Sequence, residues 1–295
     1  MTFRTRFAPS PTGPLHLGHA YSAMLAYDIA MAAGGEFLLR IEDIDQTRAR
    51  AHWCERIFDD LRWLGLKWPE PVMLQSERIG HYQRALQNLW NKGLLYVCTC
   101  DRRDIETALS APQEGVRTYG PDGLIYPGTC SGNTGDPIGC AMPEESVLRL
   151  SMEKAFVAVS ESSEPCNNFT FVEIGSGPIG ETGEISFSRQ DVLQNIGDIV
   201  LSRKNMGTSY HLSVVLDDAA QGITHVVRGQ DLFAATKIHV VLQKLMGLPT
   251  PHYHHHRLIR DEKHKRLAKR DDARAISKYR QDGATPQDIR EMVGL

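Results

Sequence analysis

The opening of the chain constrains the fold more than any other part of the sequence. Residues 3–8 alternate loosely between apolar and polar side chains and then enter a loop rich in Pro and Gly. Residues 17–33 follow as an apolar, alanine-rich helix, which a Gly-Gly pair at 34–35 ends as a C-cap. Residues 37–41 predict a second buried strand, and residues 46–64 predict a second helix. An order of strand, helix, strand and helix is the start of a parallel α/β sheet.

This rhythm breaks after residue 96. The next stretch is rich in Gly, Pro, Ser and Asn and has little helical periodicity, which favours an inserted, loop-rich or β-rich unit. Apolar runs then return at 199–201, 212–216 and 224–227, and we expect them to be strands that rejoin the same sheet, with a helix over 237–246. The expected divisions are the first half of an α/β domain (1–96), an insertion (97–190), the second half of the domain (191–247) and a helical C-terminal region (248–295).

Composition excludes several classes of protein. A hydrophobic content of 41% and a charged content of 23% are typical of a soluble globular chain, and no apolar run approaches the ~20 residues of a membrane span. The N-terminus has no apolar h-region, so we expect a cytoplasmic protein with no membrane partner. The net charge of −3 argues against broad, non-specific nucleic-acid binding. Residues 257–280 nevertheless carry ten Lys/Arg against four Asp/Glu. This basic segment is typical either of a tail that contacts phosphate groups or of a solvated helix.

The loop between the first strand and the first helix suits a phosphate group. Gly13 and Gly18 let the backbone come close to a ligand, and a helix N-terminus favours an anion. His16 and His19 share one face of the first helical turn, from which they can donate hydrogen bonds to a phosphate whose charge grows in a transition state. Capping or surface histidines, or a zinc site, would give the same spacing.

Residues 6–19, RFAPSPTGPLHLGH, closely resemble the first motif of the class I aminoacyl-tRNA synthetases of the glutamate branch. Residues 34–43 continue the family pattern, and the resemblance implies that Glu42, at the C-terminal end of a strand, holds the ammonium group of glutamate. A surface carboxylate is the alternative for Glu42. The same resemblance implies two further sets of residues: Arg6, Phe7, Ala8, Pro9 and Ser10 for glutamate, and His16, Gly18 and His19 for ATP, with both histidines catalytic.

Class I synthetases carry a second, lysine-containing loop that follows the ATP triphosphate, and residues 265–270 resemble it. The resemblance is incomplete, because Arg266 replaces the first lysine and Ala268 replaces the usual serine. Arginine keeps the positive charge with a different, planar geometry, and the serine hydroxyl is lost. We assign Lys269 to pyrophosphate as a catalytic residue and Arg266 to ATP, and we expect Mg²⁺ to accompany the ATP. Taken alone, this basic run is typical of a solvated face.

Residues 197–201, 210–218 and 224–231 resemble the second half of the same family. By that resemblance, Tyr210 and Arg228 complete the glutamate pocket. Arg228 is then the bidentate partner of the γ-carboxylate, which excludes uncharged amino acids. A structural salt bridge is the alternative for Arg228.

The cysteines predict a metal site before a disulfide, because the chain is expected in a reducing compartment. Cys98, Cys100 and Cys130 are one ligand short of a closed tetrahedral zinc site, and Cys140 or a histidine is the usual fourth ligand. Residues 124–130 resemble a tyrosine–x3–cysteine element in the zinc insertion of one family subgroup. This resemblance implies that Tyr126 is the fourth ligand of one structural zinc ion.

The resemblance covers residues 3 to about 275 and implies an α/β fold with a Rossmann-like parallel sheet of class I synthetase type, split by the zinc-containing insertion and followed by a short helical region. Only 26 residues follow Lys269, so we expect no anticodon-binding domain. These features match the subgroup that attaches glutamate to the queuosine base in the anticodon of tRNA(Asp). The expected partners are ATP, L-glutamate and tRNA(Asp) bearing queuosine, and the protein is expected to be a monomer. A paralogue that charges a tRNA 3′ end and a non-catalytic, zinc-stabilised RNA-binding module are the alternatives.

Overall fold

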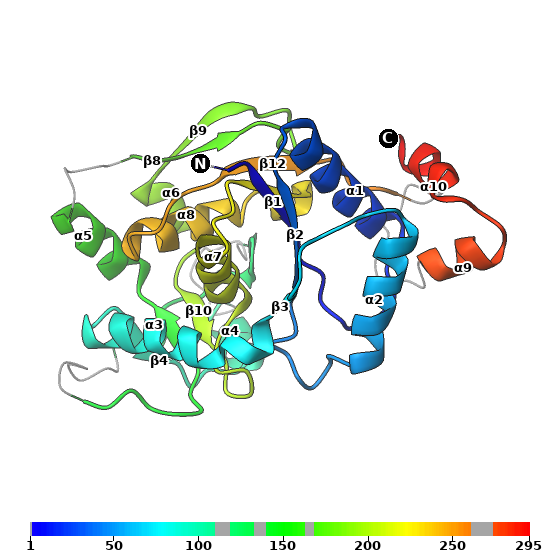
Figure 1. Ribbon diagram of the computed structural model, residues 1–295. Helices are drawn as coiled ribbons and strands as arrows, with labels where there is room; N and C mark the ends of the chain where they lie inside the picture. Colours follow the sequence, from blue (N-terminus) through cyan, green and yellow to red (C-terminus); the bar gives the residue numbers. More distant parts are fainter. Residues whose placement is uncertain (1, 110–118, 133–139, 163–167, 261–273) are drawn as a thin grey trace.

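The computed structural model describes residues 2–109, 119–132, 140–162, 168–260 and 274–295 (Figure 1). The first half of the chain contains β1 (Arg4–Phe7), α1 (Leu17–Ala32), β2 (Glu36–Ile41), α2 (Ala51–Trp63), β3 (Met73–Leu74), η1 (Gln75–Arg78), α3 (Ile79–Asn91), β4 (Leu95–Val97), α4 (Arg102–Ala108), β5 (Tyr119–Gly120), β6 (Gly123–Leu124) and β7 (Leu148–Leu150). The second half contains α5 (Met152–Ser162), β8 (Asn168–Glu173), β9 (Gly183–Ser188), α6 (Arg189–Asn195), β10 (Ile199–Ser202), α7 (Tyr210–Ala220), β11 (His225–Gly229), η2 (Gln230–Leu232), α8 (Thr236–Leu245), β12 (His252–His256), α9 (Ile276–Gln281) and α10 (Pro286–Val293).

The first half of the chain confirms the predicted order of strand, helix, strand and helix. β1 pairs in parallel with β2, and β2 pairs in parallel with β3. α2 differs most from its expected bounds, since it begins at Ala51 and not at residue 46. The Asp45 carboxylate accepts hydrogen bonds from the backbone N and the hydroxyl of Thr47 and so holds a turn where the helix was expected.

A second sheet, of order β11-β12-β8-β9, lies beside the first, so the expectation that the later strands rejoin one sheet holds only for its position. Arg4 N donates to Thr224 Oγ1 at 2.8 Å, which places β1 beside the start of β11. β11 pairs in parallel with β12, and β12 pairs in parallel with β8. The helix predicted over 237–246 is confirmed as α8, which connects β11 to β12. Parallel strands bring their carboxyl ends to one edge of the sheet, where α/β proteins bind their ligands.

Residues 212–216 form part of the helix α7, so the expectation of a strand there is wrong. The Ser209 hydroxyl accepts a hydrogen bond from Leu212 N and caps the helix. Residues 211–218 are all buried, so this part of the helix has no exposed polar face. Its central residues 212–216 therefore resemble the apolar run of a buried strand. Periodicity alone does not separate a short buried helix from a buried strand.

The strand expected at 199–201 exists as β10, but its place in the fold differs from the expectation. β10 pairs antiparallel with β7, which also pairs with β4, in a separate three-stranded sheet. β8 and β9 come from the stretch expected as an insertion, yet they join β12. The stretch 97–190 therefore contributes to three different sheets, since β5 and β6 also pair with each other.

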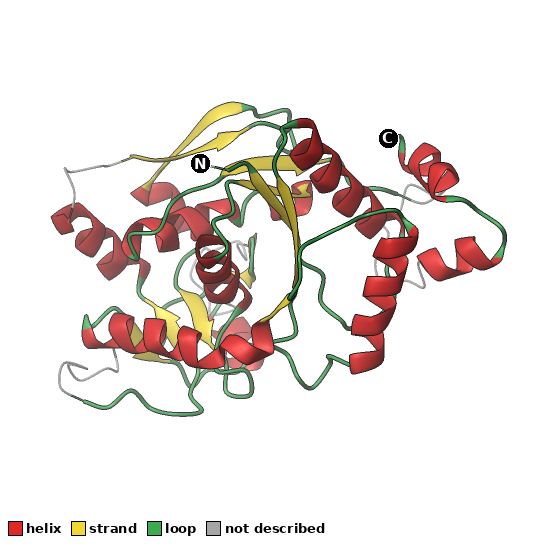
Figure 2. Cartoon of the chain, viewed as in Figure 1, coloured by secondary structure: helices red, strands yellow, loops and turns green. Residues whose placement is uncertain are grey.

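The helical C-terminal region is confirmed, and it packs on the first half of the chain, where α10 lies beside α1 (Figure 1). Arg280 of α9 pairs with Asp59 of α2 at 3.0 Å, and Arg290 of α10 contacts both carboxylate oxygens of Asp28 in α1. Figure 2 shows helices around the strands of the molecule. Within the described part of the chain, no helix is long and apolar enough to cross a membrane.

Candidate active site and metal centre

A cavity of about 1030 Å³ lies at the carboxyl ends of β1, β2 and β11, beside the N-terminus of α1. Arg266 and Lys269 lie outside the described residues. All other residues that the sequence assigned to glutamate or ATP line this cavity: Arg6, Phe7, Ala8, Pro9, Ser10, His16, Gly18, His19, Glu42, Tyr210 and Arg228. The fold therefore brings residues from both halves of the chain around one space.

His16 and His19 meet where α1 begins. His16 is the N-cap: its Nδ1 accepts a hydrogen bond from Gly18 N at 3.1 Å, and His19 Nδ1 accepts one from His16 N at 3.2 Å. A Cβ atom at Gly18 would lie only 3.0 Å from the His16 ring, so a larger residue there would displace that ring. Because each Nδ1 is an acceptor, the neutral rings carry their proton on Nε2. The capping role thus sets the tautomer that can donate to an anion.

Two carboxyl groups of the cavity region are shifted in opposite directions. Arg6 Nε and Arg40 Nη1 donate to Asp218 Oδ1 at 3.0 and 2.7 Å. Burial opposes ionisation of Asp218, but the two guanidinium groups outweigh it and hold its pKa below the ordinary value. Burial raises the pKa of Glu42, although Arg40 and Arg6 oppose the shift. A further cationic partner inside the cavity would therefore stabilise the ionised form of Glu42.

Arg228 enters the same cavity from the end of β11. Its side chain donates to His255 Nε2 at 3.1 Å, to His239 Nδ1 at 3.1 Å and to Thr236 Oγ1 at 2.7 Å. Among the described residues, no carboxylate oxygen lies within the 4.0 Å limit of an ion pair with Arg228. The structural salt bridge considered from the sequence is therefore absent from this part of the chain. Tyr210 lines the same cavity, and burial raises the pKa of its phenol.

The cavity also has lining residues that the sequence reasoning did not assign. Thr47, Arg48 and Arg50 come shortly after β2, and Leu258 and Ile259 come shortly after β12. Their positions directly after strands could have identified them from the sequence, because ligands of α/β sheets bind just beyond the carboxyl ends of the strands. The two arginines add positive charge to a space that already contains a helix N-terminus.

The described residues on either side of 261–273 lie at this cavity. Ile259 lines it, and Ala275 forms a β-bridge with His16. Ile276 N also donates to Leu15 O at 2.9 Å. The described residues that flank 261–273 therefore lie at the cavity on one side and at His16 on the other.

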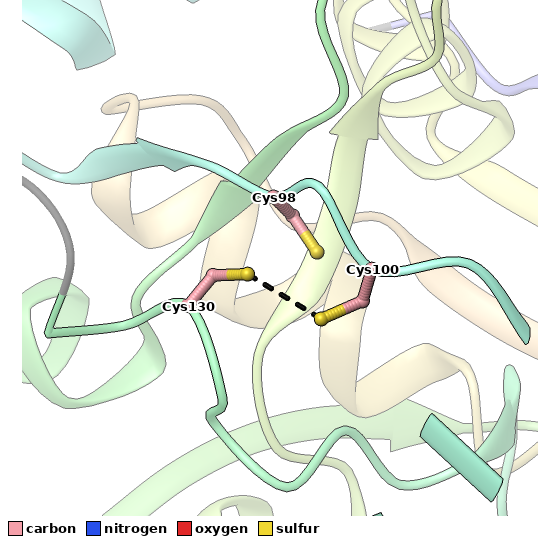
Figure 3. Close-up of side chains that lie close together, drawn as sticks. All are labelled: Cys98, Cys100 and Cys130. Carbon is pink, nitrogen blue, oxygen red and sulfur yellow. Dashed lines mark hydrogen bonds between the residues drawn. The ribbon is translucent and has the colours of Figure 1, made fainter. Parts of the chain in front are cut away.

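Cys98, Cys100 and Cys130 point their sulfur atoms toward one another (Figure 3). The three Sγ atoms all lie within 4.8 Å of one another, and those of Cys100 and Cys130 are 3.4 Å apart. Tyr126 Oη lies 3.6 Å from Cys98 Sγ and 3.4 Å from Cys100 Sγ. These four side chains, called the cysteine cluster below, surround one small volume.

The chemistry of the cysteine cluster suits a metal ion. Burial disfavours the Cys130 thiolate, but hydrogen bonds from Tyr126, Thr99 and Cys100 lower its pKa to about 6. The hydrogen bond with Tyr126 lowers the pKa of Cys100, but burial and the neighbouring Cys130 outweigh it and raise that pKa, so Cys130 is the more readily ionised thiol of the two. The thiolate is the form of cysteine that binds metals. Cys140, the alternative ligand, is exposed and does not belong to the group of three among the described residues. The cluster is therefore a candidate metal centre in which Tyr126 supplies an oxygen donor.

Comparison with known families agrees with this geometry. The family described as class I tRNA synthetases (E and Q), catalytic domain, matches residues 2–118 and 181–295. The residues between these two matches include Tyr126 and Cys130 of the cysteine cluster. The family match thus contains all residues of the cavity and only part of the cluster.

The chain is also similar along most of its length to glutamyl-Q tRNA(Asp) synthetases. The chain is 57% identical to the glutamyl-Q tRNA(Asp) synthetase of Rhodobacter capsulatus, over 99% of this chain and 99% of that protein. It is 37% identical to the protein of the same name from Symbiobacterium thermophilum, over 96% of this chain and 83% of that protein.

Solved structures of synthetases share the fold. A glutamate tRNA ligase from Elizabethkingia meningosepticum, in complex with its amino acid, matches with a TM-score of 0.72 and 26% identity. The match covers 100% of this chain and 61% of the ligase, so this chain spans less than two thirds of that protein. A methionyl-tRNA synthetase from Mycobacterium tuberculosis, with a TM-score of 0.58 and 11% identity, shares the fold alone.

Proposed function

The chain belongs to the class I tRNA synthetase family of the glutamate and glutamine branch, among its glutamyl-Q tRNA(Asp) synthetases, and on this premise we propose how its residues activate and transfer glutamate. In the first step, the α-carboxylate of glutamate attacks the α-phosphate of ATP. A carboxylate–phosphate bond forms, the bond to the β-phosphate breaks, and pyrophosphate leaves. In the second step, the glutamyl group passes to the queuosine base in the anticodon of tRNA(Asp), and AMP is released.

The observation that carries this proposal is the meeting of complementary charges in one cavity. Glu42 and Arg228 both line it, and burial raises the pKa of Glu42. The ammonium group of glutamate supplies the cation that stabilises ionised Glu42, and Arg228 receives the γ-carboxylate. Binding at these two points leaves the α-carboxylate to react.

His16 and His19 are the proposed catalytic donors to the α-phosphate. Their Nδ1 atoms accept backbone hydrogen bonds, so each neutral ring presents a proton on Nε2. α1 is a helix of 16 residues, and its N-terminus also favours the negative charge that develops during the attack. Gly18 lets the backbone approach the phosphate.

Lys269, with Arg266 beside it, is the proposed binding group for pyrophosphate. Support comes from the chain on both sides, since Ile259 and Ala275 lie at the cavity and at His16. Mg²⁺ accompanies the ATP in this proposal and supplies charge compensation for the triphosphate.

The cysteine cluster is proposed to hold one structural zinc ion through Cys98, Cys100, Tyr126 and Cys130. Two lines of support are the approach of the three sulfur atoms and the position of Tyr126 Oη, which lies 3.4 Å from Cys100 Sγ. Four protein ligands leave no open position for a reacting water, so the ion would stabilise the fold around it.

A second candidate is a paralogue that charges a tRNA 3′ end, which the likeness to a glutamate tRNA ligase favours. The two functions share the first step and differ in where the glutamyl group lands. Glutamate-dependent exchange of labelled pyrophosphate into ATP tests that first step. Absence of exchange, with the folded protein and Mg²⁺ present, would contradict the proposed function and favour a non-catalytic RNA-binding module.

A further inference from the structure

Arg228 is held almost entirely by neutral groups. Within the described chain, four of its five N–H groups have partners: Nε donates to His255 Nε2, Nη1 to His239 Nδ1, and Nη2 to both Thr236 Oγ1 and Leu232 O. The Leu232 carbonyl is the most distant of these acceptors, at 3.3 Å. In this arrangement a bidentate grip on a ligand would require Thr236 or Leu232 to give up its hydrogen bond.

The contact with His239 has a definite direction. A guanidinium group only donates, so His239 Nδ1 accepts and the ring carries its proton on Nε2. That Nε2 lies 3.1 Å from His211 Nδ1, and His211 Nε2 lies 3.4 Å from Asp122 Oδ1. Burial, followed by the charge of Arg228, holds the pKa of His239 well below its ordinary value. The ring is therefore a neutral acceptor, and two imidazoles separate Arg228 from the Asp122 carboxylate.

His255 forms a similar link on the other side. Its Nε2 accepts from Arg228 Nε, so its Nδ1 carries the proton and donates to Glu173 Oε2 at 2.5 Å. Burial lowers the pKa of His255, although the hydrogen bond to Glu173 opposes that shift. Glu173 also accepts from His255 N at 2.9 Å, which fixes the carboxylate. Here too a neutral ring stands between Arg228 and a carboxylate.

Other buried arginines in this region are compensated differently. Arg6 and Arg40 both contact Asp218 Oδ1 directly, at 3.0 and 2.7 Å. A ligand that binds an arginine paired in this way must compete with the resident carboxylate. Arg228 instead faces imidazoles, a hydroxyl and the ring of Tyr253, whose centroid lies 5.1 Å from Arg228 Cζ. An aromatic face attracts a cation without neutralising it.

We propose that His239 and His255 are positioning residues that fix the Arg228 guanidinium and leave its positive charge uncompensated, so that the cavity selects an amino acid with a carboxylate side chain over the corresponding amide. This inference rests on the proposed role of Arg228 in binding the γ-carboxylate. It adds that selection depends on what Arg228 is tied to, and not on the arginine alone.

A matched pair of variants, His239→Asn and His239→Asp, tests the inference. Both side chains place an oxygen close to the position of Nδ1, where it accepts from Arg228 Nη1, and the two differ only in charge. The measurement is pyrophosphate exchange with glutamate and, separately, with glutamine, together with the KM for ATP. Thermal unfolding of each variant shows whether it is folded.

We expect His239→Asn to keep the ratio of kcat/KM for glutamate over glutamine within about threefold of the original, and His239→Asp to lower it by about tenfold or more. The KM for ATP stays the same in both variants. If His239 had a purely structural role, its substitution would lower kcat/KM for glutamate and for glutamine together and leave their ratio unchanged. Equal ratios in the Asn and Asp variants would therefore overturn the inference.

A second pair, Thr236→Asn and Thr236→Asp, replaces the first if His239→Asp does not fold, because Thr236 Oγ1 also accepts from Arg228 at 2.7 Å. The same two outcomes apply. Arg228→Leu separates this inference from the proposed function. If Arg228→Leu leaves the use of glutamate unchanged, the proposed pocket is wrong; if it abolishes glutamate use while the Asn and Asp variants agree, only the positioning claim fails.

Discussion

The cavity at the strand ends and the cysteine cluster differ in how the chain builds them. The cavity draws Arg6, Glu42 and Arg228 from three strands or their ends, and its groups face a space of about 1030 Å³. The cluster takes its side chains from residues 98–130, and its sulfur atoms face one another within 4.8 Å. An open site with charges directed into it suits substrates, whereas a closed site suits a structural ion. Changes in the two sites should therefore have separable consequences.

The largest expected effect comes from removing the charge of Arg228. Arg228→Leu leaves the γ-carboxylate without a partner in a buried setting, which we expect to cost about 3 kcal/mol or more in kcat/KM for glutamate. Pyrophosphate exchange at varied glutamate measures this loss. The zinc content should not change, because no residue of the cluster is touched. An equal loss of ATP binding, measured without glutamate, would instead indicate a structural role for Arg228.

The phosphate donors come next. His19→Ala and Lys269→Ala should each lower glutamate-dependent exchange by about 100-fold, if these groups stabilise transition-state charge. For His16, Ala also removes the N-cap of α1, which costs about 1 kcal/mol of stability. His16→Asn is the sharper variant, since Asn keeps a cap and loses the ring donor. Near-normal exchange in the His19 variant would remove it from the catalytic residues.

Variants of the cysteine cluster should lose zinc and stability, whereas the cavity variants should lose activity. Cys98→Ser should release the zinc and lower Tm by on the order of 5 °C, because the ion contributes folding free energy. Cys140→Ser is the matched control, and it should keep one zinc ion per chain since Cys140 is exposed. Elemental analysis together with thermal unfolding checks both variants. Loss of metal from Cys140→Ser, with metal retained in Tyr126→Phe, would show that the fourth ligand is misassigned.

The smallest effect is a pH dependence inside the cavity. Burial raises the pKa of Glu42, so its protonated form persists to higher pH than in an ordinary carboxyl group. Only the ionised form attracts the ammonium group, so the KM for glutamate should rise severalfold as the pH falls through the raised pKa. Glu42→Gln should have a high KM that changes little with pH. A KM that stays constant with pH in the original protein would contradict the assignment.

Much of the fold and of the site follows from local patterns. The parallel start of the sheet was predictable because β1 ends before a loop rich in Pro and a Gly-Gly pair separates α1 from β2. The cavity residues were found because their motif resembles a known family, and each lies near the end of a strand or the start of a helix. The three cysteines of the cluster were predicted from their grouping in the sequence, and Tyr126 was predicted from the resemblance of residues 124–130 to a known zinc insertion.

One element type and the long-range contacts were harder to predict. The prediction of a strand at 212–216 was wrong because all of residues 211–218 are buried, and no polar face marks the helix α7. The sheet of β10 depends on β7, which comes from the middle of the chain. One link to Arg228 is also distant in sequence: His255 lies 27 positions from Arg228, and Glu173, which contacts His255, lies 82 positions from His255. No local pattern signals such contacts.

The fate of labelled glutamate on tRNA(Asp) tests the central claim most directly. Two preparations of this tRNA, one bearing queuosine and one lacking it, are incubated with the protein, ATP and Mg²⁺, and nuclease digestion locates the label. The account predicts label in the anticodon fragment of the queuosine-bearing tRNA and none in the other preparation. Label at the 3′ end, in either preparation, would contradict it.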